Sequence, residues 1–451
     1  MKKWLRAVSV AVLILALGGI IIRLMSVVKD SYLQHSYELY VEPEKKEADK
    51  ARICFAWWGG SDRNQLTMQA IEMFEGQHPE IQVTAQYQEY DGYHDKISVQ
   101  LSTSDAPDIF QFNPENLGTV VERGQVVPLD SFVQEGILDI SNIPESNLYD
   151  GKYNGQLYGI PMSIQTFCML YNKYLFDLAG VEYPSDEWTW DDFDDILSAL
   201  KAGLPEGIYP SADLRNAEIT TMLMIHQQGG SYLTKSGQFN FQEQIRRPLE
   251  LFQDYADRGL VPPIEISSVN SVDALFVNER VALIASYNAM AQTLQANAKD
   301  GHVYGLAAIP ESTTGERLGA YVKGDMLFLI NSNSPHQKEA VMLLNEFINN
   351  PEIIELLGVS RGLPPSIEAQ KQLERSEGLE TEVFRLQKLA EASNDVPEPR
   401  YIKGWSDCVK AVDDITRQYA FQKITLDEAV EGMELQFESI LRPPGKADTL
   451  P

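Results

Sequence analysis

The sequence predicts an α/β fold with two domains, and two observations support this prediction. Strand-like and helix-like segments alternate between residues 53 and 110, with short loops between them. Such alternation is typical of a parallel sheet that is covered by helices. The chain also has 451 residues, which is long for a single hydrophobic core and favours two domains.

The first strand and the first helix adjoin at a short turn. The run from Ile53 to Trp57 is apolar and predicts a buried strand. The next residues, Gly59-Gly60-Ser61-Asp62, are typical of a turn that leads into a helix cap. The helix itself is indicated by apolar residues at helical spacing, which are Leu66, Ala70, Ile71 and Phe74.

The same pattern then repeats along the chain. Alternating apolar residues from Ile81 to Tyr87 predict a second strand, the segment from Tyr93 to Leu101 predicts a helix, and a third strand begins at Ile109. Later elements are expected at residues 157–171 for a strand and at 188–193, 335–349 and 426–441 for helices. In open parallel sheets ligands bind beyond the carboxyl ends of the strands. That rule points to two loops, at residues 57–60 and 111–113.

Charge and cysteine content exclude several classes of function. The net charge is −28, from 37 basic and 65 acidic residues. Such a surface repels nucleic acid and anionic lipid, so neither is an expected partner. Cys54, Cys168 and Cys408 are widely spaced; at most one disulfide can form, and any pairing stays open. The six histidines show no metal-ligand spacing, so no metal or other cofactor is predicted.

The N-terminal segment predicts export. Met1 to Arg6 carries three basic residues, and Ala7 to Ile22 is an unbroken run of apolar or small residues. Residues 1–28 are therefore expected to be either a signal peptide or an uncleaved membrane anchor, with the bulk of the chain outside the cytoplasm. The polar residues 29–50 are expected to be a flexible tether, and residues 442–451 a loose tail.

The middle of the chain holds a set of motifs in a fixed order. They are Gly155 to Pro161 (GQLYGIP), Leu170 to Lys173 (LYNK), Ala179 to Val181 (AGV) and Trp188 to Phe193 (WTWDDF). In this order and spacing they resemble extracellular solute-binding protein family 1, the sugar-binding components of ABC importers, which includes maltose-binding protein. The similarity covers nearly all of residues 51–441.

The resemblance implies a periplasmic-binding-protein-like fold, in which two α/β lobes are joined by a hinge around a ligand cleft. Lobe 1 is expected to contain residues 51–161 with 289–335, and lobe 2 residues 162–288 with 336–441. The hinge crossings are expected near residues 162–167 and 286–288. The implied function is capture of a carbohydrate by a monomer, which delivers it to the membrane permease of an ABC importer.

A sugar site needs flat aromatic rings and planar polar side chains, because sugars combine weakly apolar faces with a rim of hydroxyls. Trp57 and Trp58 point to opposite faces of their strand, so one of them is expected to contact the ligand. The alternatives for the polar candidates are helix capping, surface charge and turn formation. The candidates from the strand ends are Trp57, Trp58, Asp62, Arg63, Gln111 and Asn113; those that the resemblance adds are Gln165, Tyr287, Arg361 and Trp405.

Two further classes of function were weighed. The chain has no GxSxG, GxxxxGK[ST] or strand-linked GxGxxG motif, which speaks against an enzyme. No cysteine follows the apolar run to accept a lipid, unlike many exported members of the family. A sugar-sensing protein, which presents its ligand-bound form to a membrane receptor, is therefore the alternative to transport.

Overall fold

The computed structural model describes residues 50–103, 105–216, 218–232, 234, 239–311, 322–374, 379–393 and 404–441. The expected signal peptide or anchor, almost all of the expected tether and the expected tail lie outside these residues. Within the described residues, no helix is both long and apolar enough to span a bilayer. Residues 51–451 form one compact unit, and the fold below is that of this unit.

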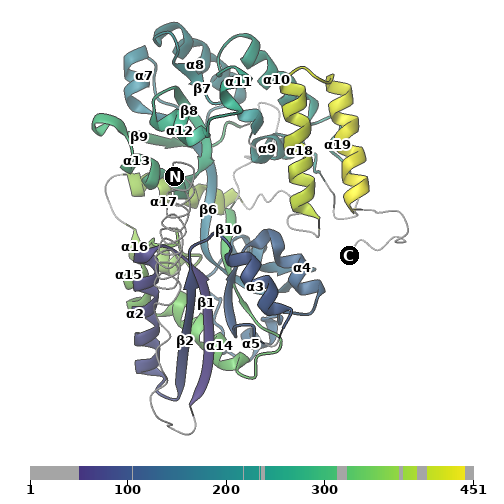
Figure 1. Ribbon diagram of the computed structural model, residues 1–451. Coiled ribbons are helices and arrows are strands. Elements are labelled where there is room, and N and C mark those ends of the chain that lie inside the picture. The colour runs from purple at the N-terminus through teal and green to yellow at the C-terminus, as the bar shows by residue number, and fades with distance from the viewer. Residues whose placement is uncertain are drawn as a thin grey trace, which may run out of the picture. The chain divides into compact units, whose positions relative to one another are not determined.

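A mixed sheet organises this unit, with the strand order β2-β1-β3-β10-β6-β8-β7 (Figure 1). β1 (Ala51–Trp58) pairs in parallel with β2 (Ile81–Gln88) and with β3 (Ile109–Phe112). β10 (Val322–Ile330) runs antiparallel between β3 and β6 (Gly159–Asn172). The three strands predicted from the N-terminal pattern therefore exist, and their carboxyl ends lie at one edge of the sheet.

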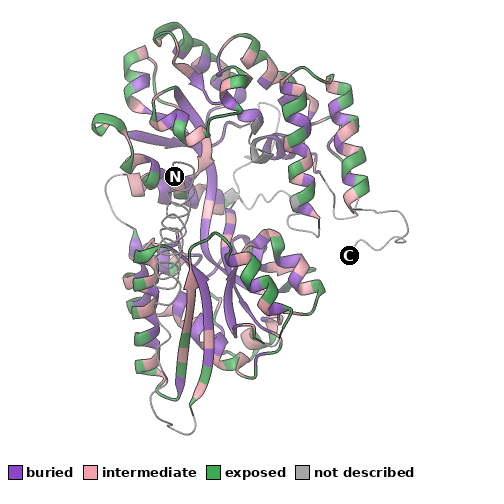
Figure 2. Ribbon diagram, in the orientation of Figure 1, coloured by how far each residue is buried: buried purple, intermediate pink, exposed green. Residues whose placement is uncertain are grey.

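The long strand β6 connects the two lobes. Its first half, up to Thr166, pairs with β10, and from Phe167 onward it pairs with β8 (Val281–Tyr287) and β9 (Tyr304–Ala307). β7 (Tyr209–Ser211) extends the second part of the sheet beside β8. β6 is buried along most of its length (Figure 2). The change of partners falls inside the predicted crossing at residues 162–167.

Helices cover the strands of each lobe. The first hydrophobic core joins β1, β2, β3 and the start of β6 to helices of lobe 1. These helices are α2 (Ser61–Gln77), α3 (Tyr93–Leu101), α4 (Leu117–Glu122), α5 (Asp130–Gln134), α6 (Glu145–Leu148), α14 (Gln337–Asn349) and α15 (Pro351–Leu357).

The second core belongs to lobe 2 and includes the second half of β6. α8 (Trp190–Gly203) begins within the helix expected at residues 188–193, and Thr189 and Asp192 form a capping box at its start. α18 (Trp405–Ala420) and α19 (Leu426–Leu441) lie side by side (Figure 1). The other helices of this lobe are α7 (Lys173–Ala179), α9 (Glu218–Gln227), α10 (Arg246–Asp257), α11 (Ile264–Ser267), α12 (Val272–Val277) and α13 (Ala291–Ala296).

Two further helices pack against the hinge. α16 (Ile367–Leu373) and α17 (Leu379–Ser393) belong to a third core, which also contains Ile164, Cys168 and Leu170 of β6. At the point where β6 changes partners, the Thr166 hydroxyl donates a hydrogen bond to Gln387 of α17 at 3.0 Å. The Thr166 backbone N–H donates to the Asn288 side chain at 2.9 Å. The hinge strand is therefore held by side chains from later in the chain.

The expected lobe boundaries are wrong in two segments. Ala291, Leu294 and Leu306 pack with strands of the second lobe, although residues 289–335 were expected in the first. Helix α14 packs in the first core, although residues 336–441 were expected in the second lobe. The chain therefore returns to lobe 1 through β10 and not at residues 286–288. The apolar face of a helix shows that it covers a sheet, but it does not show which sheet.

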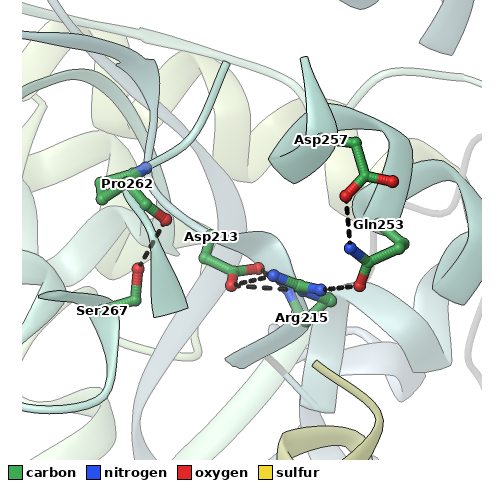
Figure 3. A network of polar contacts seen from close by, with 6 residues as sticks. All are labelled: Asp213, Arg215, Gln253, Asp257, Pro262 and Ser267. Carbon is green, nitrogen blue, oxygen red and sulfur yellow. Dashed lines mark hydrogen bonds and ion pairs between the residues drawn. The ribbon is translucent and has the colours of Figure 1, made fainter. Parts of the chain in front are cut away.

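A polar network in lobe 2 is buried at Asp213 and Arg215 and reaches the surface at Asp257 (Figure 3). Asp213 accepts hydrogen bonds from Nε and Nη2 of Arg215, and the Nη2–Oδ2 distance is 2.8 Å. Arg215 Nη1 donates to Gln253 at 2.7 Å, and Gln253 donates to Asp257 at 2.8 Å. The network ties the loop after β7 to helix α10. Elsewhere, Cys54, Cys168 and Cys408 are all free thiols.

Candidate functional site

A pocket of about 560 Å³ lies at the carboxyl ends of β1 and β3. This is the edge at which open parallel sheets bind ligands, and it includes both loops that the sequence indicated. The walls come from the end of β1, the first turn of α2, the loop after β2, the segment after β3, and β10. The lining residues are Trp58, Arg63, Tyr90, Asn113, Glu115, Asn116, Asp325 and Met326.

The two tryptophans at the end of β1 have different environments. Trp57 is 0 % exposed, stacks on Tyr87 with ring centroids 5.0 Å apart, and donates its indole N–H to Asn64 at 2.8 Å. Trp58 is 7 % exposed and lines the pocket. One ring of the pair therefore lies in the core and the other lines the pocket, as strand alternation requires; ligand contact by Trp58 stays a prediction. Trp57 itself is a core residue, and its inclusion among the candidates was wrong.

Aromatic rings hold Trp58 in place. Its ring centroid lies 5.6 Å from that of Tyr90 and 5.2 Å from those of Tyr93 and His94. Burial lowers the pKa of His94, which favours the neutral imidazole within this cluster. The Asn113 side chain donates a hydrogen bond to the Tyr90 hydroxyl at 3.0 Å. The pocket thus has a rigid aromatic wall that is tied to one of its amide side chains.

Arg63 forms a cationic wall of the pocket. Its Nε and Nη2 atoms donate to the carbonyl oxygen of Ser360 at 3.2 and 3.1 Å, and Nη1 donates to the Trp58 carbonyl at 3.4 Å. Burial lowers the pKa of Arg63, and the charge of Asp325 opposes this effect. Asp62, its neighbour in the first turn of α2, is exposed and lies outside the pocket lining. The expectation for Asp62 is therefore wrong, and its position suits the helix dipole instead.

Two carboxylates, those of Glu115 and Asp325, also line the pocket. Glu115 pairs with Lys323, whose Nζ lies 3.1 Å from Oε1. Lys323 also lies over the ring of Tyr287, 5.1 Å from its centroid, and so connects the pocket to the end of β8 in lobe 2. Burial raises the pKa of Asp325, while the charge of Lys323 lowers it. Next to Asp325, Met326 has a left-handed backbone with φ of +52°, a conformation that residues other than glycine rarely adopt.

The remaining predicted candidates lie outside this pocket. Gln111 is fully buried, and its amide has no hydrogen-bond partner among the described residues. Trp405 is 5 % exposed and packs in the core of lobe 2 near Tyr232, so it is not a pocket residue. Gln165 and Tyr287 are half-buried at the hinge, where Gln165 faces Lys323 in the sheet register.

Arg361 is buried near Arg63, outside the pocket lining. It is 5 % exposed, and its Nη2 donates to the Thr67 hydroxyl at 2.6 Å. Its Nε and Nη1 have no hydrogen-bond partner among the described residues. Burial, with a further contribution from Arg63, lowers the pKa of Arg361 to about 9. Arg361 is therefore placed to support the wall of the site and not to line it.

Five residues of the pocket are absent from the predicted site residues. Tyr90 follows β2 and Glu115 and Asn116 follow β3, so the strand-end rule, applied a few residues further along each loop, would have found them. Asp325 and Met326 carry no such signal. They enter on β10, more than 200 residues later in the chain, and only the sheet pairing brings them to the pocket.

The lining residues offer a defined set of interactions. Trp58 and Tyr90 present aromatic surface, Asn113 and Asn116 both donate and accept hydrogen bonds, Arg63 donates, and the two carboxylates accept. This set matches a polyhydroxylated ligand with weakly apolar ring faces.

Comparison with known proteins assigns the family. The model of the bacterial extracellular solute-binding protein family matches residues 60–352. The chain belongs to this family. Its members are binding proteins that act outside the cytoplasm, and the family predicted from the motifs is confirmed, together with its two-lobed α/β fold.

Several relatives show how far the similarity extends. A binding protein of Brucella abortus (strain 2308) is 25 % identical over 278 residues, which is 60 % of this chain and 66 % of the relative, slightly less than two thirds. The galactooligosaccharide-binding protein of Bacillus subtilis (strain 168) is 23 % identical over 394 residues, 85 % of this chain and 89 % of that protein. A similar solved structure is that of a periplasmic oligogalacturonide-binding protein from Yersinia enterocolitica, in complex with saturated digalacturonic acid. Its TM-score is 0.70 at 22 % sequence identity, and the match covers 87 % of this chain and 99 % of that one. This similarity shows that the two proteins share a fold.

Proposed function

We propose that this protein binds a sugar or oligosaccharide outside the cytoplasm and delivers it to an ABC importer. The observation that carries the proposal is the pocket at the ends of β1 and β3, where aromatic surface from Trp58 and Tyr90 meets planar polar side chains. A sugar ring stacks on aromatic faces, while its hydroxyls need both donors and acceptors. Family membership supports the proposal, since two of the three proteins compared above bind galactooligosaccharides or oligogalacturonides according to their names.

The hinge supports a mechanism in which the lobes close over the ligand. Strands β6 and β10 connect the lobes, and a ligand that contacts both lobes would favour the closed form. Lys323 is placed to couple the two events, because it pairs with Glu115 in the pocket and lies over Tyr287 of lobe 2. Gln165 and Tyr287 are proposed as hinge-side contacts of the closed form. Binding and release without chemical change of the sugar is the proposed activity.

The proposal is tested by thermal melting of the full chain with a panel of mono- and oligosaccharides, because a ligand that binds the folded form raises the melting midpoint. Tyr90→Ala is the test variant, since Tyr90 is 52 % exposed and its truncation removes a wall of the pocket at small cost in stability. Tyr183→Ala is the matched control, an exposed tyrosine of lobe 2 that also forms one side-chain hydrogen bond.

The expected result is a rise in midpoint with one class of sugar, which Tyr90→Ala reduces and Tyr183→Ala leaves unchanged. If both variants keep the full rise in melting midpoint, the sugar binds outside this pocket. No rise with any sugar, together with a rise with peptides or polyamines, would retain the fold and contradict the sugar assignment.

A further inference from the structure

We propose that the ligand of this pocket is an uncharged sugar, and that Asp325 and Glu115 reject uronic acids and sugar phosphates. The inference rests on the proposed function and adds the chemical class of the ligand. It separates two kinds of cargo that occur among proteins of this fold, since the galactooligosaccharides of one relative are neutral and the digalacturonic acid of another is anionic.

The first argument is the balance of charge in the pocket. The charged lining residues are Arg63, Glu115 and Asp325, and Lys323 is paired with Glu115. These four groups carry two positive and two negative charges. An uncharged ligand leaves this balance intact, whereas a carboxylate or phosphate adds a negative charge in a partly desolvated site. His94 does not offset that charge, because burial lowers its pKa and favours the neutral ring.

The second argument is that both cations already hold protein acceptors. The Nε and Nη2 atoms of Arg63 form the side-on fork that usually binds a carboxylate, and the Ser360 carbonyl oxygen accepts from both. Lys323 is engaged with Glu115 and with the ring of Tyr287. An anionic ligand would have to displace one of these contacts, while a hydroxyl can accept from the N–H groups of Arg63 that remain.

The third argument is the position of Asp325. Within the described residues its half-buried carboxylate forms no ion pair, although it lines the pocket together with Arg63. An ionised carboxylate only accepts hydrogen bonds, so it attracts sugar hydroxyls and repels a second carboxylate. The left-handed backbone of Met326 beside it costs free energy, and strained conformations of this kind often cluster at functional sites. We therefore assign Asp325 as the residue that selects uncharged sugars over anionic ones.

The experiment compares neutral and acidic sugars of the same ring configuration on the full chain. Galactooligosaccharides are paired with oligogalacturonides, and any other neutral sugar that raises the melting midpoint is paired with its uronic acid and its phosphate. At about pH 7, titration calorimetry is expected to show binding of a neutral sugar, with its acidic counterpart at least about 100-fold weaker. An acidic sugar that binds as tightly as its neutral counterpart would overturn the inference while leaving the proposed function in place. If neither neutral nor acidic sugars bind, both the proposed function and this inference are contradicted.

Two variants of equal charge identify the residue responsible. Asp325→Asn keeps the shape of the side chain and removes its charge. It is expected to lower the affinity for the neutral sugar about tenfold or more. It is also expected to bring the ratio of the neutral-sugar affinity to the acidic-sugar affinity at least about tenfold closer to one. Asp91→Asn changes the net charge equally at an exposed position outside the pocket lining, and it is expected to change neither. If Asp91→Asn shifts the ratio as much as Asp325→Asn does, the discrimination comes from the overall charge of −28 and not from Asp325.

Discussion

At the scale of single residues, a charged group behind the pocket wall is buried at a cost in stability. Arg361 is buried with two nitrogen atoms that have no partner among the described residues, and it lies beside a second arginine. A guanidinium without a carboxylate is a poor contributor to stability. Its retention is explained if it holds the Ser360 segment against α2, where the Ser360 carbonyl fixes Arg63.

This explanation predicts opposite effects of Arg361→Met on stability and on binding. The apolar side chain fills a similar volume, so the free energy of unfolding of the ligand-free chain is expected to stay the same or rise by about 1–3 kcal/mol. Affinity for the sugar is expected to fall, because Arg63 loses its support. Denaturant unfolding and titration calorimetry measure the two effects, with Arg361→Lys as the charge-conserving control. A large loss of stability in Arg361→Met would instead show that the guanidinium is a structural group.

Asp325 gives a second prediction, on pH. Burial raises the pKa of Asp325, so its ionised form is less stable in the folded chain than in the unfolded chain. That cost is present above the folded-state pKa and is lost as pH falls through it. Asp325→Asn is therefore expected to raise the ligand-free melting midpoint at about pH 7 and to lose this advantage towards about pH 4. A variant that is less stable than the wild type at neutral pH would refute this.

How much of the site was predictable depended on the type of residue. Strand ends and alternation indicated Trp58, Arg63 and Asn113, and all three line the pocket, because both rules follow from local backbone geometry; that they bind the ligand stays a prediction. Gln111 and Trp405 carry the same polar or aromatic character, yet the structure buries them. Residue type does not reveal which side chain tertiary packing leaves exposed, and Asp325 reaches the pocket through pairing between strands that lie far apart in the chain.

At the scale of elements, buried polar contacts hold segments together inside each lobe. The Asp213–Arg215 pair is the clearest case, with side chains that are 1 % and 2 % exposed. Gln253 and Asp257 extend it along α10 (Figure 3). No sequence motif predicts this network, because it joins the segment after β7 to helix α10, about 40 residues later in the chain.

Arg215→Ala is expected to lower the free energy of unfolding by about 3–5 kcal/mol, because it leaves the Asp213 carboxylate buried without its partner. Arg258→Ala is the matched control. Arg258 pairs with Asp194 and Asp254 at the surface, where such pairs contribute about 0–1 kcal/mol. Chemical denaturation of both variants measures the difference. Equal losses would contradict the structural role that we assign to the buried pair.

Element existence was easier to predict than element placement. The strands and helices near the N-terminus, the start of α8 and the strand β6 all agree with the sequence patterns. The assignment of α13, β9 and α14 to lobes was wrong. Amphipathic periodicity shows that a helix has a buried face, but it does not show which lobe the helix joins. The chain re-enters lobe 1 through β10, which inserts antiparallel between β3 and β6. The local sequence pattern does not reveal such an insertion.

At the scale of the whole molecule, the proposed closure predicts a change in size. If the sugar draws the lobes together, the radius of gyration of the full chain in solution is expected to fall when saturating sugar is added. Small-angle X-ray scattering measures this change. Tyr90→Ala at the same sugar concentration should show a smaller decrease, because less of it is bound. A radius of gyration that is unchanged under conditions where calorimetry shows saturation would rule out closure of the lobes by this ligand.

The central claim is that a sugar binds at the carboxyl ends of β1 and β3. A crystal structure of the full chain with the sugar selected by thermal melting tests it most directly. We predict electron density for a sugar ring against Trp58 and Tyr90, with a ring hydroxyl within hydrogen-bond distance of the Asp325 carboxylate. A sugar bound elsewhere, with this pocket empty, would contradict the account.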